Sequence, residues 1–117
     1  MARYHVRQLA LDGNDLDALV DFWLAALGYE LDHRDEGYAV LRDPDGAEPR
    51  VFLQQVPEVK LGKNRAHFDI AVPDEAEAVE RLIALGARVL WREDYPTHHW
   101  TVLADPQGNE FCVGDFG

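Results

Sequence analysis

Three ionisable side chains of different types stand two residues apart near the middle of the chain: Arg65, His67 and Asp69. Successive side chains of a strand point to opposite faces, so a strand over residues 65–72 would place all three on one face. Proton transfer next to a carbonyl needs such groups. His67 would be the base, Asp69 would orient it, and Arg65 would hold the oxyanion. The alternative is a half-buried antiparallel strand, whose side chains alternate between polar and apolar without any chemistry.

Composition excludes several classes of partner. The 117 residues carry a formal net charge of −11, and their basic side chains are scattered. Nucleic-acid binders and proteins of anionic membranes need clustered Lys and Arg, so we expect neither partner. Cys112 is the single cysteine, which leaves no internal disulfide. With no signal-like start and no membrane-length apolar run, the sequence predicts one cytoplasmic domain over residues 1–117.

Hydrophobic periodicity predicts the same order of elements twice, namely a strand, a helix and three strands. Short polar residues at Asn14 or Asp15 and at Asp74 are suited to cap the helices, and glycines follow both. The first set of predicted elements is a strand at 3–12, a helix ending at Leu27, and strands at 30–34, 38–42 and 50–56. The second set is a strand at 65–72, a helix at 75–85, and strands at 88–92, 100–104 and 110–114.

Two sequence blocks recur in the same order in both halves. Ala26-Leu27-Gly28 returns 58 residues later as Ala84-Leu85-Gly86, and the turn after Leu41 returns as the turn after Leu103. A repeated block indicates duplicated architecture. We therefore predict module one at about 3–56, a linker at 57–63 and module two at about 64–115. The predicted class is α+β: two paired βαβββ modules form a curved mixed sheet around a central cleft, with the helices outside.

The alternation along each strand predicts which side chains line that cleft. Tyr38 and Trp100 fall at equivalent positions of the two halves and would give it an aromatic wall on each side. The predicted lining consists of Gln8, Tyr38, Val40, Phe52, Gln54, Arg65, His67, Asp69, Trp100, Val102, Glu110 and Cys112.

Several motifs resemble the vicinal oxygen chelate superfamily. They are Phe22-Trp23 followed by Leu27-Gly28-Tyr29, the two Asp-Pro-x-Gly turns, and the segment from Asp105 to Phe111. The segment from Lys63 to Asp69 is similar to one in the glyoxalase-like and bleomycin-resistance-protein-like branch. The resemblance covers nearly the whole chain and implies the fold. It leaves the reaction open, since this superfamily includes isomerases, lyases, dioxygenases, epimerases and drug-sequestering proteins.

The resemblance also implies four metal positions, which here hold Gln8, Gln54, His67 and Cys112. Of these, only His67 is a usual ligand, and Glu110 lies on the face of Cys112, where it could substitute. These ligands carry less negative charge than the protein ligands of catalytic divalent metals generally do. A divalent metal is therefore an alternative that the sequence does not favour, and the cofactor is left open.

Two functions remain open at this stage. The first is a glyoxalase-type lyase or isomerase, less favourably a dioxygenase, that acts on a small carbonyl or hydroxy compound through His67, Arg65 and Asp69. The second is a non-catalytic protein that sequesters a small aromatic or polar compound by stacking and hydrogen bonds. Its binding residues would be Gln8, Tyr38, Phe52, Gln54, Trp100, Glu110 and Cys112. The resemblance further implies a homodimer.

Overall fold

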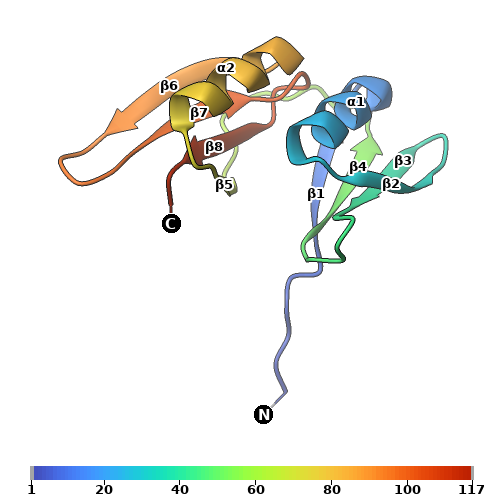
Figure 1. Ribbon diagram of the computed structural model, residues 1–117. Coiled ribbons are helices and arrows are strands. Elements are labelled where there is room, and N and C mark those ends of the chain that lie inside the picture. The colour runs from blue at the N-terminus through green and yellow to red at the C-terminus, as the bar shows by residue number, and fades with distance from the viewer. Residues whose placement is uncertain (1, 117) are drawn as a thin grey trace. The chain divides into compact units, whose positions relative to one another are not determined.

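The computed structural model describes residues 2–116, which form two compact units that divide between Val59 and Lys60. Each unit holds one helix and one four-stranded mixed sheet (Figure 1). The predicted α+β class and the two βαβββ modules are confirmed. The shared cleft stays a prediction.

The first unit contains one parallel and two antiparallel strand pairs in the order β1-β4-β3-β2. Asp15 caps the helix by accepting a hydrogen bond from the Ala18 amide at 3.2 Å, and Gly28 ends it with φ 67°. The neighbouring Asn14 instead binds the backbone oxygens of Val56 and Glu58. The elements are β1 (Gln8–Gly13), α1 (Leu16–Leu27), β2 (Glu30–Arg34), β3 (Tyr38–Arg42) and β4 (Arg50–Gln55).

The second unit repeats this arrangement, with its strands in the order β5-β8-β7-β6 and with β5 parallel to β8. Asp74 caps its helix through the Glu77 amide at 3.1 Å. Among the described residues, no helix has the length and hydropathy that crossing a membrane requires. The elements are β5 (Asp69–Ala71), α2 (Glu75–Leu85), β6 (Arg88–Asp94), β7 (His99–Ala104) and β8 (Glu110–Gly114).

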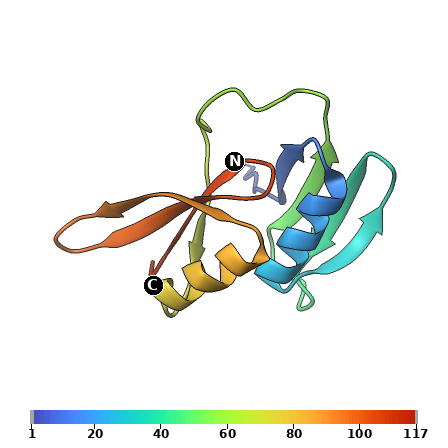
Figure 2. The ribbon, with the colours of Figure 1, turned by 90° about the horizontal axis from the view of Figure 1, so that it is seen from above.

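Each helix covers one face of its own sheet (Figure 2). Phe22 and Trp23 are buried in the core of the first unit, where their rings meet edge to face at 4.9 Å. Both residues therefore belong to the core. In the second unit, Leu82 of α2 is buried, as are Leu103 and Phe111 of the sheet. The opposite face of each sheet is therefore the one left for a ligand.

Glu75, the first residue of α2, ties that helix to β6 and β7. Its buried carboxylate accepts hydrogen bonds from Arg92 Nη1 at 2.7 Å and Thr101 Oγ1 at 2.7 Å, and it lies 2.8 Å from His99 Nδ1. Burial alone would raise the pKa of Glu75. The pKa is nevertheless held below its usual value, because Thr101 and His99 donate hydrogen bonds to the carboxylate and Arg92 adds a positive charge beside it. Together these effects outweigh the effect of burial.

The duplication extends to irregularities of the sheets. The register of β2 against β3 shifts between Leu31 and His33, and that of β6 against β7 shifts between Val89 and Trp91. These bulges lie 58 residues apart, which is the spacing of the first repeated block. A bulge changes which side chains share a face of a strand. Because both units have a bulge at the equivalent position, their hairpins are shaped alike.

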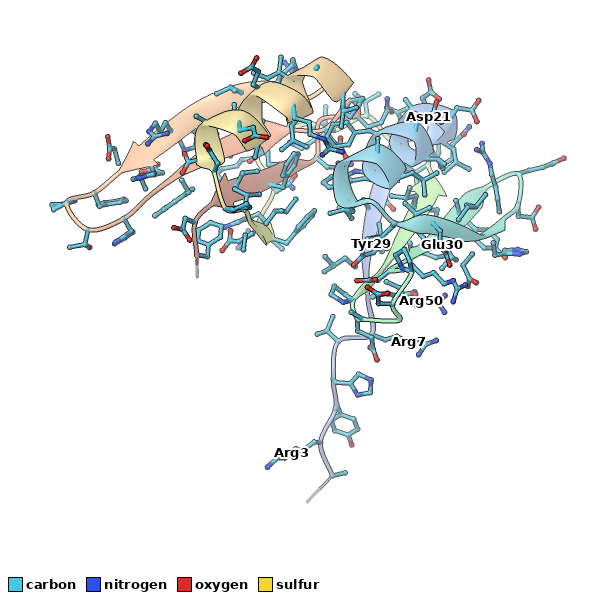
Figure 3. All side chains as sticks on the ribbon, in the orientation of Figure 1. Arg3, Arg7, Asp21, Tyr29, Glu30 and Arg50 are labelled. Carbon is cyan, nitrogen blue, oxygen red and sulfur yellow. The ribbon has the colours of Figure 1, made fainter. Side chains whose placement is uncertain are left out.

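The predicted strand at 3–12 was wrong at its start, because β1 begins at Gln8. Its partner β4 begins at Arg50. The preceding Pro49 has no N–H to continue the ladder, and its carbonyl accepts a hydrogen bond from Tyr29 Oη at 2.9 Å. Figure 3 shows Arg3 and Arg7 on the segment before β1 and Tyr29 and Arg50 at the sheet.

The predicted strand at 65–72 was also too long, since β5 covers only Asp69–Ala71. The ladder with β8 ends at the bond from the Cys112 amide to the Phe68 oxygen, at 3.0 Å. The next acceptor along β8 is the Glu110 carbonyl, which instead receives the Asn64 side-chain amide at 3.2 Å. A bend at 65–66 follows from this contact, so the row expected from Arg65 to Asp69 is only partly formed.

Candidate functional site

The uncovered face of the second sheet carries a row of four register partners. Asp69 pairs with Cys112, Cys112 with Val102, and Val102 with Trp91. The pairing therefore aligns a carboxylate, a thiol and an indole across β5, β8, β7 and β6.

A concave pocket of about 260 Å³ lies over this row. It is close to the lower end of the usual range for ligand sites, roughly 300 Å³, and so suits a small compound. Its lining consists of Lys63, His67, Trp91, Glu93, Tyr95, Trp100, Val102, Glu110 and Cys112.

Aromatic rings form one wall of the pocket. Tyr95 stacks on Trp100 at 5.5 Å. Glu93 fixes two rings, because its carboxylate accepts hydrogen bonds from Trp91 Nε1 at 3.0 Å and Tyr95 Oη at 3.3 Å. The Lys63 ammonium lies 5.6 Å from the centre of the Trp91 ring. These contacts hold flat apolar surfaces in place before any ligand arrives.

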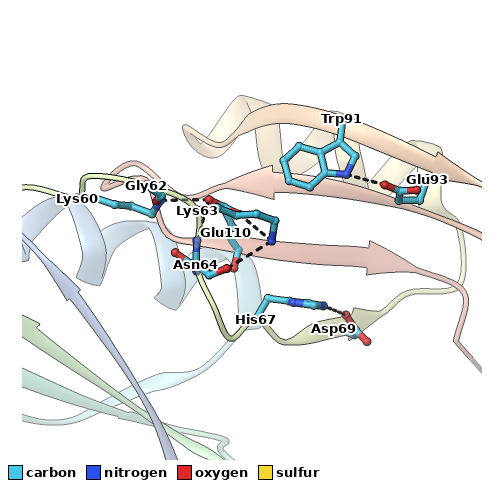
Figure 4. Close-up of polar contacts among 9 residues, drawn as sticks. All are labelled: Lys60, Gly62, Lys63, Asn64, His67, Asp69, Trp91, Glu93 and Glu110. Atoms are coloured by element: carbon cyan, nitrogen blue, oxygen red, sulfur yellow. Dashed lines mark hydrogen bonds and ion pairs between the residues drawn. The ribbon is translucent and has the colours of Figure 1, made fainter.

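Glu110 forms the polar floor and is only 6% exposed. Its Oε2 accepts hydrogen bonds from Lys60 Nζ at 3.1 Å and from the Asn64 amide at 3.3 Å (Figure 4). Burial would raise the pKa of Glu110, but these hydrogen bonds and the charges of Lys60 and Lys63 lower it below the usual value. Glu110 is therefore ionised at neutral pH.

The second oxygen of Glu110 is differently placed. Oε1 is buried and, among the described residues, accepts no hydrogen bond; the Lys63 ammonium lies 3.6 Å away. Buried carboxylate oxygens nearly always accept a hydrogen bond, so an unused one on a residue that lines a pocket indicates a place for a ligand's donor.

His67, Asp69 and Cys112 gather at one side of the pocket. His67 Nε2 lies 3.6 Å from Asp69 Oδ1 (Figure 4). Burial, and next the charge and hydrogen bond of Asp69, raise the pKa of Cys112 to about 11. The thiol is therefore protonated at neutral pH and is not a nucleophile there.

The predicted row and the observed lining differ. His67, Trp100, Glu110 and Cys112 line the pocket as expected from their strands. Arg65 lies exposed at the bend and is not among the described lining residues, where Lys63 supplies the cation.

Sequence reasoning missed Trp91, Glu93 and Tyr95. Their two-residue spacing is a strand signal, but the predicted strand ended at Arg92, whereas β6 continues to Asp94. The bulge beside Trp91 then aligns it with Val102. Lys63 was assigned to the linker and was not among the predicted lining residues.

The predicted ligand residues of module one share a face of the first sheet. Tyr38 is the register partner of Gln54 and stacks on Phe52 at 5.3 Å. Gln8 begins β1 and pairs with Arg50. That these residues join the pocket of the second unit stays a prediction.

The four metal positions implied by the superfamily do not fit a tightly held catalytic ion. Gln8 and Gln54 offer only neutral amide oxygens, and the proton of Cys112 is firmly bound. Glu110 is a poor replacement, because Lys60 and Lys63 already pair with its negative charge and only its buried Oε1 is left to bind an ion. This donor set therefore does not match the charged ligands that hold catalytic divalent ions.

The chain is similar to known proteins of one family. The sequence model of the glyoxalase-like domain matches residues 8–114. None of the curated proteins searched matches the chain.

Three solved structures illustrate the shared fold. A possible glyoxalase from Bacillus cereus is 22% identical, with a TM-score of 0.73 and coverage of 96% of this chain and 99% of its own. A bleomycin-binding protein from Streptomyces verticillus, complexed with copper(II)-bleomycin, is 20% identical, with a TM-score of 0.70 and full coverage of both chains (100% each). Lactoylglutathione lyase from Agrobacterium tumefaciens is 20% identical, with a TM-score of 0.71 and coverage of 97% and 95%. At these identities the likeness shows the fold alone.

Proposed function

Because the chain belongs to the glyoxalase-like domain family of the vicinal oxygen chelate superfamily, we propose that it binds a small molecule in the pocket of its second module. The ligand is a small planar aromatic compound that carries a hydrogen-bond donor. The observation that carries this proposal is Glu110, a lining residue of the pocket whose buried Oε1 accepts no hydrogen bond from the described residues.

The chemistry of the lining supports this class of ligand. Trp91 and Trp100 supply indole rings to the lining, against which a flat apolar molecule can pack. A donor on that molecule would complete the hydrogen bonding of Glu110. Glu93 adds a second carboxylate, and Lys63 limits the excess negative charge. The fold shared with a bleomycin-binding protein is compatible with binding without turnover.

The test uses matched pairs of compounds. Thermal shift and tryptophan fluorescence are measured with planar aromatic amines and with analogues in which the N–H groups are methylated. We expect the donors to bind at least about tenfold more tightly, because the analogues leave Oε1 unpaired. Trp91→Ala should weaken binding, whereas Tyr4→Ala, which removes a ring that is 94% exposed, is the control. Equal binding of both compounds of each pair would contradict the proposal.

A lyase or isomerase is the second candidate, and the contact between His67 and Asp69 favours it. Asp69 would orient the imidazole as a base towards a proton next to a carbonyl, and Lys63 rather than Arg65 would stabilise the oxyanion. The test is incorporation of deuterium from D₂O into small α-hydroxy carbonyl compounds, followed by NMR. Exchange lost in His67→Ala but retained in His5→Ala would support it; exchange equal to that of buffer would exclude it.

We also propose a homodimer, as the superfamily resemblance implies. Light scattering at micromolar concentration should give twice the mass of the chain, which is 13.3 kDa. A mass of one chain would refute this proposal.

A further inference from the structure

A second pocket of the second module, with a volume of about 310 Å³, lies where β7 begins and β8 ends. These two ends are neighbours because the strands are antiparallel. The pocket shares only Trp100 with the one described above, and its volume is within the range of small-molecule sites. Its lining consists of His98, His99, Trp100, Asp115 and Phe116.

One lining side chain, His99, is anchored to the buried carboxylate of Glu75. Nδ1 of His99 lies 2.8 Å from Oε1 of Glu75, whose side chain is only 7% exposed. Arg92 and Thr101 donate to the other oxygen, Oε2, and the lowered pKa of Glu75 keeps the carboxylate ionised at neutral pH. Because an ionised carboxylate only accepts hydrogen bonds, Nδ1 of His99 carries the proton of this contact.

The second nitrogen of His99 is therefore left for a ligand. The side chain is 47% exposed, and the described residues give Nε2 no hydrogen bond. With the proton on Nδ1, Nε2 of the neutral ring is an acceptor. A carboxylate beside one imidazole nitrogen stabilises the protonated ring, which makes the other nitrogen a stronger acceptor. A phenolic hydroxyl, whose pKa is about 10, is an acidic neutral donor that suits such a nitrogen.

The other walls of this pocket are aromatic and are held in place. His98 stacks on Trp100 with ring centres 5.6 Å apart, and Thr97 Oγ1 lies 2.9 Å from His98 Nδ1. Phe116 packs closely on Gly114, where an added Cβ would lie 3.0 Å from Cζ of Phe116. The glycine thus lets this ring approach the end of β8, and the pocket gains flat apolar surface.

We propose that this pocket binds a small hydroxyaromatic compound, whose hydroxyl donates to Nε2 of His99 and whose ring packs against Trp100 and Phe116. Asp115 adds a carboxylate to the lining, and the chain has a formal net charge of −11. Both disfavour an anionic ligand such as an aromatic carboxylate.

This inference goes beyond the function proposed above, because it needs neither Glu110 nor Trp91. Glu75 acts as a positioning residue: it fixes the ring and the tautomer of His99 without being a lining residue itself.

The experiment is a titration at pH 7.5 with 4-methylphenol and with its methyl ether, followed by the ¹⁵N NMR signals of the histidine rings. In the free protein, His99 should show the tautomer that is protonated at Nδ1. The phenol should bind at least about tenfold more tightly than the ether, which has no donor, and should shift the Nε2 signal of His99 in a saturable way. Equal binding of both compounds, tighter binding of benzoate, or saturation that leaves this signal unmoved would overturn the proposal.

Variants complete the test. His99→Phe should lower the affinity for 4-methylphenol at least about tenfold, whereas His5→Phe, at a side chain that is 75% exposed, is the matched control and should not change it. A loss in Trp91→Ala as large as that in His99→Phe would place the compound in the first pocket and overturn the proposal.

Glu75→Gln tests the positioning role. It should give His99 signals of mixed tautomers and a weaker affinity for 4-methylphenol, and an unchanged tautomer would contradict this role. Since Glu75 is buried, circular dichroism checks that its variant is folded. His99 is half exposed, so its own variant keeps the proposal falsifiable if Glu75→Gln does not fold.

Discussion

Replacing Glu110 by Gln should destabilise the second module while preserving the shape of the side chain. The carboxylate receives the Lys60 ammonium at 3.1 Å and the Asn64 amide at 3.3 Å. A hydrogen bond to a charged group contributes about 1.5–3 kcal/mol, and the Lys60 side chain is 30% exposed, which favours the lower end. The Lys63 side chain is 62% exposed, so its ion pair adds little. We expect a loss of about 2 kcal/mol in the free energy of unfolding.

The sign of the pH dependence follows from the lowered pKa of Glu110. A carboxyl with a lowered folded-state pKa stabilises the protein above its unfolded-state pKa, and this contribution is lost as the pH falls through the folded-state value. The difference between the wild type and Glu110→Gln should therefore be full at neutral pH and shrink in acid.

Urea denaturation and hydrogen exchange of the Asn64 amide measure this effect. Exchange should accelerate in Glu110→Gln, because that amide donates directly to the carboxylate. Glu77→Gln, at an exposed position of α2, is the matched control. A loss below about 0.5 kcal/mol, which is the usual range of surface substitutions, would refute this account of Glu110. A difference that does not change with pH would refute it too.

Three further outcomes are expected. Glu75→Ala should cost about 3 kcal/mol in urea unfolding, because a buried acceptor of three hydrogen bonds is lost; a cost equal to that of Glu77→Ala would contradict this. Cys112, with its pKa raised to about 11, should resist iodoacetamide at pH 7 in the native protein and react after unfolding, as mass spectrometry would show. Gly28→Ala should lower stability by about 1 kcal/mol because φ is 67°, whereas Gly37→Ala, without a positive φ, should cost less in the same assay.

The sequence predicted the fold well because its signals are local and occur twice. The caps at Asp15 and Asp74 and the glycines after both helices bound the helices as expected. The strand errors arose where long-range partners decide the boundary. Neither Pro49 beside β1 nor the contact of Asn64 with Glu110 is visible in the alternation of a single strand.

The candidate site was predicted less completely for the same reason. His67, Trp100, Glu110 and Cys112 line the pocket because simple alternation holds in β7 and β8 and because His67 lies next to β5. Alternation failed for Arg65, which lies at a bend. Trp91 was missed because a bulge sets its face, and bulges have no firm sequence signature. Lys63 is placed by its ion pair with Glu110, which no local pattern indicates.

The indole N–H signals in a ¹⁵N NMR spectrum test the central claim most directly. The chain has three tryptophans, of which Trp91 and Trp100 line the pocket and Trp23 is fully buried in the first unit. The protein is titrated with a planar aromatic amine selected by thermal shift. The account predicts that the signals of Trp91 and Trp100 move together in a saturable way while that of Trp23 stays in place. Saturable binding that leaves both pocket signals unmoved would contradict the assignment of the ligand to the second module.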